Sequence, residues 1–230
     1  MTNNYQPFKP DWYYSKFNIP NLTQIQQEFL SVKDQVWHKY SDHNLTEKGD
    51  WWEFSAMPGS DIEQHIPSFI SWLKDVGIYS KWISTAFSVV NSNTNPMRTH
   101  VDSLDTANRY LSLNIPILNC ENSYTVWYDA ELDHSQVAPD LQPNEPGYEE
   151  LNTRFRYDPP LRYGRWTVES TEQEVMRVET VEPVLVNVSM PHRPMSDHNK
   201  MRILACSRFS PELTEQEVKQ LGIERPFEQL

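Results

Sequence analysis

Short apolar stretches, separated by turn residues, follow one another from residue 82 to residue 209. They predict eight strands, over residues 82–90, 97–102, 109–118, 123–130, 166–170, 175–181, 184–190 and 201–209. Many short strands with turn signals between them are typical of a sandwich or barrel rather than of a parallel α/β sheet. We therefore predict a mainly β fold.

Residues 1–80 have helical spacing instead. Apolar stripes over residues 22–37 and 62–76 predict two helices, with Asn21 as a cap of the first and Gly77 ending the second. We interpret these stripes as core that packs against the outside of a sheet. A helix stripe is more often core than part of a cofactor site.

The 230 residues suit one structural domain with three parts. We predict an N-terminal helical extension (1–80), a β core (81–211) and a C-terminal helix (212–230) that begins with the capping box Thr214–Glu217. Residues 131–164 interrupt the strand pattern with five prolines and many charged residues. Two interpretations of this insertion stay open: a lid over the substrate, or a surface excursion.

The composition disfavours several classes of binding partner. The formal net charge of −12 and the pI near 5 disfavour non-specific binding to nucleic acid or to anionic membranes. The sequence shows no signal peptide and no membrane-spanning apolar run, so we expect a cytoplasmic protein. Cys120 and Cys206 are expected to be reduced, buried thiols, because the sequence shows no secretory signal. Neither has a zinc-binding companion pattern. The pattern does not indicate an oligomeric state.

Three residues carry a metal-binding pattern: His100, Asp102 and His192. Side chains at i and i+2 of a strand share a face, so His100 and Asp102 can converge on one ion. His192 ends the apolar run that starts at Pro183. A hairpin turn near Asp197 would place His192 opposite Arg202 across an antiparallel ladder.

Two imidazoles and one carboxylate are the ligand set of non-haem Fe(II) oxygenases. Arg202 would bind the far carboxylate of a dicarboxylate that chelates the metal, through a bidentate pair. Val186, Val188 and Met190 would form an apolar wall beside His192. Taken singly, His192 is also compatible with a loop histidine and Arg202 with a surface arginine; the combination favours the metal site.

The stretch from Trp82 to Pro211 resembles the Fe(II)/2-oxoglutarate-dependent dioxygenase superfamily. Residues 99–116 resemble its aspartyl/asparaginyl β-hydroxylase-like branch, although the best-known members of that branch lack the aspartate. The resemblance implies a double-stranded β-helix (jelly roll, cupin-like) with N-terminal helices packed on one sheet. It also implies roles for five residues: His100, Asp102 and His192 bind iron, Arg202 binds the C5 carboxylate of 2-oxoglutarate, and Arg109 is a second cation for substrate or co-substrate.

The expected function is hydroxylation of an amino-acid, peptide or protein side chain with Fe(II), 2-oxoglutarate and dioxygen. Three alternatives remain. One is a metal-binding cupin-type protein without 2-oxoglutarate chemistry, in which Arg202 is a structural cation. The others are an oxygenase that acts on another small molecule and a catalytically silent jelly-roll interaction module.

Overall fold

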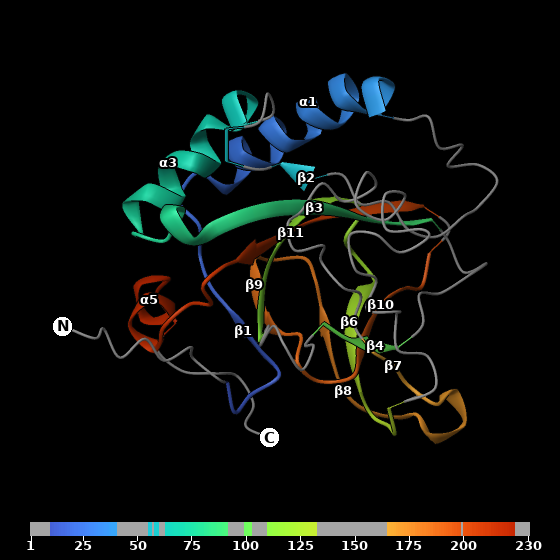
Figure 1. Ribbon diagram of the computed structural model, residues 1–230. Coiled ribbons are helices and arrows are strands. Elements are labelled where there is room, and N and C mark those ends of the chain that lie inside the picture. The colour runs from blue at the N-terminus through green and yellow to red at the C-terminus, as the bar shows by residue number, and fades with distance from the viewer. Residues whose placement is uncertain are drawn as a thin grey trace, which may run out of the picture.

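A computed structural model of the protein describes residues 10–40, 55–56, 58–59, 63–91, 99–102, 110–132, 165–198 and 200–223. Two antiparallel β-sheets face each other, with helices on one side (Figure 1). The six-stranded sheet has the order β1 (Tyr14–Lys16), β9 (Val184–Asn187), β5 (Leu111–Leu118), β11 (Met201–Phe209), β3 (Trp82–Asn91), β2 (Ser55–Ala56). The five-stranded sheet has the order β7 (Arg165–Trp166), β4 (His100–Val101), β10 (His192–Ser196), β6 (Ser123–Asp129), β8 (Gln173–Glu179).

The chain passes repeatedly from one sheet to the other. β3 and β5 lie in the six-stranded sheet, whereas β4 and β6 lie in the five-stranded sheet. After β7 and β8 the same alternation resumes, because β9 and β11 belong to the larger sheet and β10 to the smaller. This alternation makes the protein a double-stranded β-helix, so the predicted fold class is confirmed.

Helices α1 (Leu22–Tyr40) and α3 (Pro67–Asp75) cover the outer face of the six-stranded sheet (Figure 1). The rings of Phe29 and Phe69 lie 5.2 Å apart, and Phe69 meets Trp82 of β3 edge-on at 5.9 Å. Fully burying such side chains contributes about 1.5–3 kcal/mol each. The apolar stripes of both helices are therefore core, as predicted. Within the described residues, no helix is long and apolar enough to cross a membrane.

The helix ends follow the local sequence. The second helix starts later than predicted: a 3₁₀ turn (Glu63–His65) comes first, and Pro67 then occupies the first turn of α3. A proline fits there because the first helical N–H groups have no intrahelical acceptor. Gly77, at φ 78°, follows the helix as predicted. The predicted capping box is present at the start of α5 (Glu215–Gln220).

One predicted strand is two strands in different sheets. β9 ends at Asn187, whose Oδ1 accepts hydrogen bonds from the Ser189 N–H (3.1 Å) and from Ser189 Oγ (2.7 Å). An asparagine side chain that binds the backbone two residues ahead turns the chain. His192 therefore begins β10 instead of ending the preceding strand. Strands β1 and β2 were also not predicted.

The predicted hairpin between His192 and Arg202 is wrong. β10 pairs with β4 and β6, whereas β11 pairs with β3 and β5, so the two residues lie in opposite sheets. The residues around Asp197 do form a turn, but this turn connects strands of two different sheets and not two strands of one sheet. Turn chemistry and strand alternation look the same for a hairpin and for such a crossing.

Candidate metal centre and anion site

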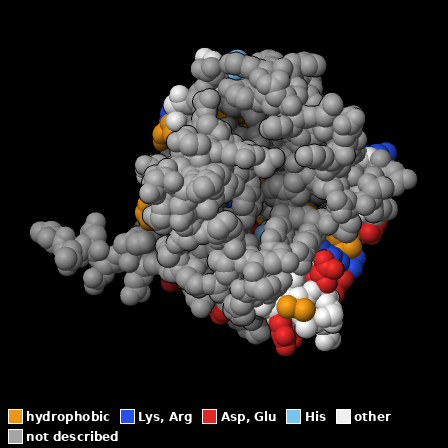
Figure 2. All heavy atoms as spheres, turned by 45° about the vertical axis from the view of Figure 1, so that its right-hand side comes forward, with side chains coloured by type: hydrophobic (Ala, Val, Ile, Leu, Met, Phe, Trp, Pro, Cys, Tyr) orange, Lys and Arg blue, Asp and Glu red, His pale blue; other side chains and the backbone are white. Residues whose placement is uncertain are grey.

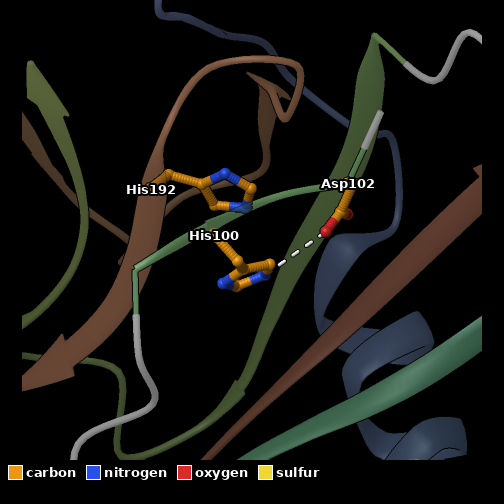
Figure 3. Close-up of side chains that lie close together, drawn as sticks. All are labelled: His100, Asp102 and His192. Carbon is orange, nitrogen blue, oxygen red and sulfur yellow. Dashed lines mark ion pairs between the residues drawn. The ribbon is translucent and has the colours of Figure 1, made fainter. Parts of the chain in front are cut away.

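His100, Asp102 and His192 converge at the end of the five-stranded sheet (Figure 3). His192 of β10 lies directly opposite His100 of β4 across the antiparallel ladder, and their ring centroids are 4.7 Å apart. Opposed residues share a face of the sheet. Asp102 follows β4, and its Oδ1 lies 3.3 Å from His100 Nε2. One ligand atom from each residue lies within 4.8 Å of those of the other two.

The turn between β9 and β10 anchors this arrangement. His192 Nδ1 donates a hydrogen bond to the Met190 carbonyl at 2.8 Å, so its Nε2 is left to act as an acceptor or metal ligand. The Asp102 N–H donates to the Val188 carbonyl, also at 2.8 Å. Two of the three candidate ligands are therefore oriented by the same turn, which the sequence pattern did not reveal.

Burial and charge prepare His192 and Asp102 for a cation. Burial lowers the pKa of His192 to about 4, and the neighbouring His100 adds to this, so the imidazole is neutral at pH 7. Burial alone would raise the pKa of Asp102, but Arg208 and His100 outweigh it and hold that pKa well below its usual range. Neutral imidazole and ionised carboxylate are the protonation states that bind metals.

The metal-free protein is expected to lose stability as the pH falls from about 6.5 to about 4. Across that range the unfolded chain takes up a proton on His192, whereas the folded chain does not. The loss is roughly 3 kcal/mol, since each pKa unit corresponds to about 1.4 kcal/mol. Asp102 acts in the same direction at lower pH, because its folded-state pKa is also depressed. Urea unfolding at several pH values measures this slope.

Two glutamine variants test the assignment of the slope. His192→Gln removes the titrating group, so its stability should depend less on pH between 6.5 and 4 than that of the wild type. His65→Gln is the matched control, because His65 is an exposed histidine in a 3₁₀ turn. A slope that is the same in all three proteins would show that His192 is not its source.

Arg202 is a buried cation inside the barrel. It lies on β11 and is 0% exposed. Its Nη2 donates to Thr180 Oγ1 at 3.3 Å, but its Nε and Nη1 have no hydrogen-bond partner among the described residues. The nearby Cys120 thiol does not neutralise it, because burial raises the pKa of that thiol. A buried charge without a counter-charge is costly, which points to an anionic ligand as its partner.

Arg202 lies farther from His192 than the predicted hairpin would place it, because the two residues are in different sheets. Thr180, its partner, donates to the Ser123 carbonyl at the start of β6, whereas His192 pairs with Trp127 near the other end of that strand. Four residues of strand span roughly 13 Å. The Arg202 guanidinium and the three candidate metal ligands therefore lie at separate points along the barrel.

Arg208 is a site residue that the sequence interpretation missed. Its Nη2 donates to Asp102 Oδ2 at 2.6 Å, from the sheet opposite to the one that holds the histidines. A signal for it was present: Arg202 and Arg208 are six residues apart, and residues separated by an even number share a strand face. The facing side of β11 thus carries two arginines toward the barrel interior.

The predicted apolar wall is present. Val186 and Val188 belong to a buried cluster with Trp127, and Met190 packs against this cluster. The Trp127 indole N–H donates to the Asn187 carbonyl at 2.8 Å, and Tyr14 stacks on the indole ring at 6.0 Å. Trp127 lies opposite His192 across the ladder of β6 and β10, so the cluster adjoins that histidine.

The second predicted cation, Arg109, lies outside the described residues, as does most of the insertion. The two ends of the insertion are described. Leu132 bridges to Thr167, whose N–H donates to the Thr99 carbonyl at 3.1 Å, next to His100. The insertion therefore starts and finishes beside the strand that carries the first candidate ligand. Figure 2 shows a hollow in this face of the molecule, with a histidine side chain visible inside it.

No protein-family model and no curated protein matches the sequence. Three solved structures are similar at low identity. The non-heme alpha ketoglutarate dependent carbocyclase SnoK from nogalamycin biosynthesis is 12% identical (96% of this chain, 90% of that chain, TM-score 0.45). AviO1 from Streptomyces viridochromogenes Tue57 is 10% identical (88% and 92%, TM-score 0.44). A Pseudomonas putida prolyl-4-hydroxylase is 11% identical (86% and 91%, TM-score 0.38).

Proposed function

We propose that this protein is a non-haem Fe(II)/2-oxoglutarate-dependent dioxygenase. The observation that carries the proposal is the convergence of His100, Asp102 and His192, whose ligand atoms lie within 4.8 Å of one another inside a double-stranded β-helix. Two imidazoles and a carboxylate fit Fe(II) and leave coordination positions open for small ligands.

Different residues bind the metal and the co-substrate. His100, Asp102 and His192 hold the metal, and the Met190 carbonyl fixes the tautomer of His192. Arg202 binds the C5 carboxylate of 2-oxoglutarate with its two free nitrogens, and Thr180 orients the guanidinium. Bound Fe(II) and 2-oxoglutarate together supply the oxidation of a substrate C–H bond by dioxygen. The Trp127 cluster excludes water from one side of the centre.

For the substrate, we propose an amino-acid, peptide or protein side chain that bears a carboxylate or an amide. The resemblance of residues 99–116 to the aspartyl/asparaginyl hydroxylase-like branch supports this class. Arg109, the second cation that the same resemblance implies, would meet the anionic or amide group of the substrate.

An anaerobic titration tests the chemistry. Fe(II) added to the purified protein with 2-oxoglutarate is expected to give a weak visible charge-transfer band, because the keto acid chelates the metal. The control is the same titration with succinate in place of 2-oxoglutarate. Succinate is not a keto acid, so no band is expected. After admission of dioxygen, succinate release measured across a panel of acidic and amide-bearing amino acids and peptides, with neutral lipids as comparison, assigns the substrate class.

Each outcome separates one class from another. Iron binding without the charge-transfer band would favour the cupin-type alternative, in which Arg202 is a structural cation. Absence of iron binding would favour a silent interaction module. A band with succinate release only on neutral apolar compounds would keep the oxygenase and reject the proposed substrate.

A further inference from the structure

The two oxygens of Asp102 have different partners. Oδ1 lies 3.3 Å from His100 Nε2 and faces the point where the candidate ligands meet. Oδ2 accepts a hydrogen bond from Arg208 Nη2 at 2.6 Å. Both side chains of this ion pair are largely shielded, with 13% and 20% exposure for Asp102 and Arg208. A short charge-assisted hydrogen bond in such surroundings fixes geometry more firmly than a surface pair does.

Arg208 reaches Asp102 from the opposite sheet. Its strand, β11, pairs on both sides along the six-stranded sheet, whereas Asp102 follows β4 of the five-stranded sheet. Arg208 lies opposite Ser84 of β3, just before a register shift between Arg208 and Phe209. Bulges of this kind re-aim side chains and are common beside active sites.

We propose that Arg208 is a positioning residue that holds Asp102 as a monodentate ligand of the metal centre. This inference rests on the proposed function. With Oδ2 held by the guanidinium, Oδ1, which lies beside His100 Nε2, is the oxygen that would bind the metal. An octahedral ion would then receive three protein atoms and would keep three positions open.

The number of open positions decides whether the chemistry is possible. A chelating keto acid takes two positions, and dioxygen needs the third. A carboxylate that binds through both oxygens would occupy one of these three, so that co-substrate and dioxygen could not bind together. By holding Oδ2, Arg208 would keep available the position that dioxygen requires.

A titration with Co(II) alone tests this role, because Co(II) is stable in air and its visible spectrum reports coordination number. The variants are Arg208→Gln and Arg208→Lys. Arg208→Gln is expected to weaken Co(II) binding about 10–100-fold, the usual effect of losing a partner of a metal ligand. Its spectrum should shift from that of the wild type as the carboxylate changes its mode of binding. Arg208→Lys, which keeps the charge, should recover part of the affinity.

Arg177→Gln is the matched control. Arg177 lies on the exposed edge strand β8 and pairs with Glu174 outside the barrel, so its loss should change neither affinity nor spectrum. Near-ultraviolet circular dichroism confirms that each variant is folded. If Arg208→Gln does not fold, Arg208→Lys carries the comparison: an altered spectrum with a native fold supports the proposal.

Three results would overturn the proposal. Wild-type affinity and spectrum in both Arg208 variants would remove the role of Arg208 but leave the metal centre intact. Unchanged Co(II) binding with a raised 2-oxoglutarate KM would assign Arg208 to the co-substrate instead. A wild-type protein that binds no Co(II) would overturn the metal centre and, with it, this role of Arg208.

Discussion

Replacement of His192 by alanine is expected to abolish 2-oxoglutarate turnover. The variant loses one of three candidate ligands, and the two that remain lie on a single strand end. Loss of a side chain that only hydrogen-bonds a metal ligand lowers metal affinity about 10–100-fold. Loss of the ligand itself should therefore lower the affinity more than about 100-fold. Isothermal titration with Fe(II) under anaerobic conditions, together with a succinate assay, measures both effects.

His65→Ala is the control for this experiment, because His65 is exposed and far in sequence from the three candidate ligands. The folded state of His192→Ala is checked by urea unfolding in the absence of metal. If the alanine variant binds iron and turns over 2-oxoglutarate at the wild-type rate, His192 is not a ligand.

Replacement of Arg202 by alanine is expected to raise the 2-oxoglutarate KM strongly while leaving Fe(II) affinity near that of the wild type. Loss of a buried charge partner costs on the order of 2–5 kcal/mol, which is roughly 30-fold to a few thousand-fold in affinity. Arg202→Lys should have a smaller effect, because lysine keeps the charge but lacks the planar fork. Steady-state succinate assays at varied 2-oxoglutarate give the KM of each variant.

Stability measurements separate this role from a structural one. In the apoprotein the Arg202 guanidinium is buried with two unpaired nitrogens, so Arg202→Met should be at least as stable as the wild type when no co-substrate is present. A structural cation would show the opposite, a large loss of stability with little change in KM. Unchanged KM values in the alanine and lysine variants would move the carboxylate partner elsewhere, with Arg208 and Arg109 as the next candidates.

Strand alternation in the sequence was sufficient to predict a β sandwich or barrel and to select the three residues that the structure brings together as a candidate metal centre. His100 and Asp102 are two residues apart, and the apolar run before His192 indicated a strand near the core. Local periodicity reports which residues share a face, and the metal motif depends on little else. The same argument, applied to the even-numbered positions of β11, would have included Arg208.

The relation between His192 and Arg202 could not be predicted in this way. It depends on whether the chain turns back within a sheet or crosses to the facing sheet, and both use similar turn residues. The deciding contacts are non-local: β10 finds its partners in β4 and β6, about 90 and 70 residues earlier in the chain. Such pairings depend on the packing of the whole barrel, so the local sequence pattern does not indicate them.

The position of both arginines on β11 constrains how this protein can change in evolution. β11 is held on both sides, by β3 and β5, so it cannot slide without breaking two ladders. A one-residue insertion between Arg202 and Arg208 would turn one of them toward the helices, because side chains alternate between faces. A two-residue insertion would keep both inside but separate them further, by roughly 7 Å. Insertions and deletions in this strand should therefore be far rarer among relatives than substitutions, and any that occur should come in pairs.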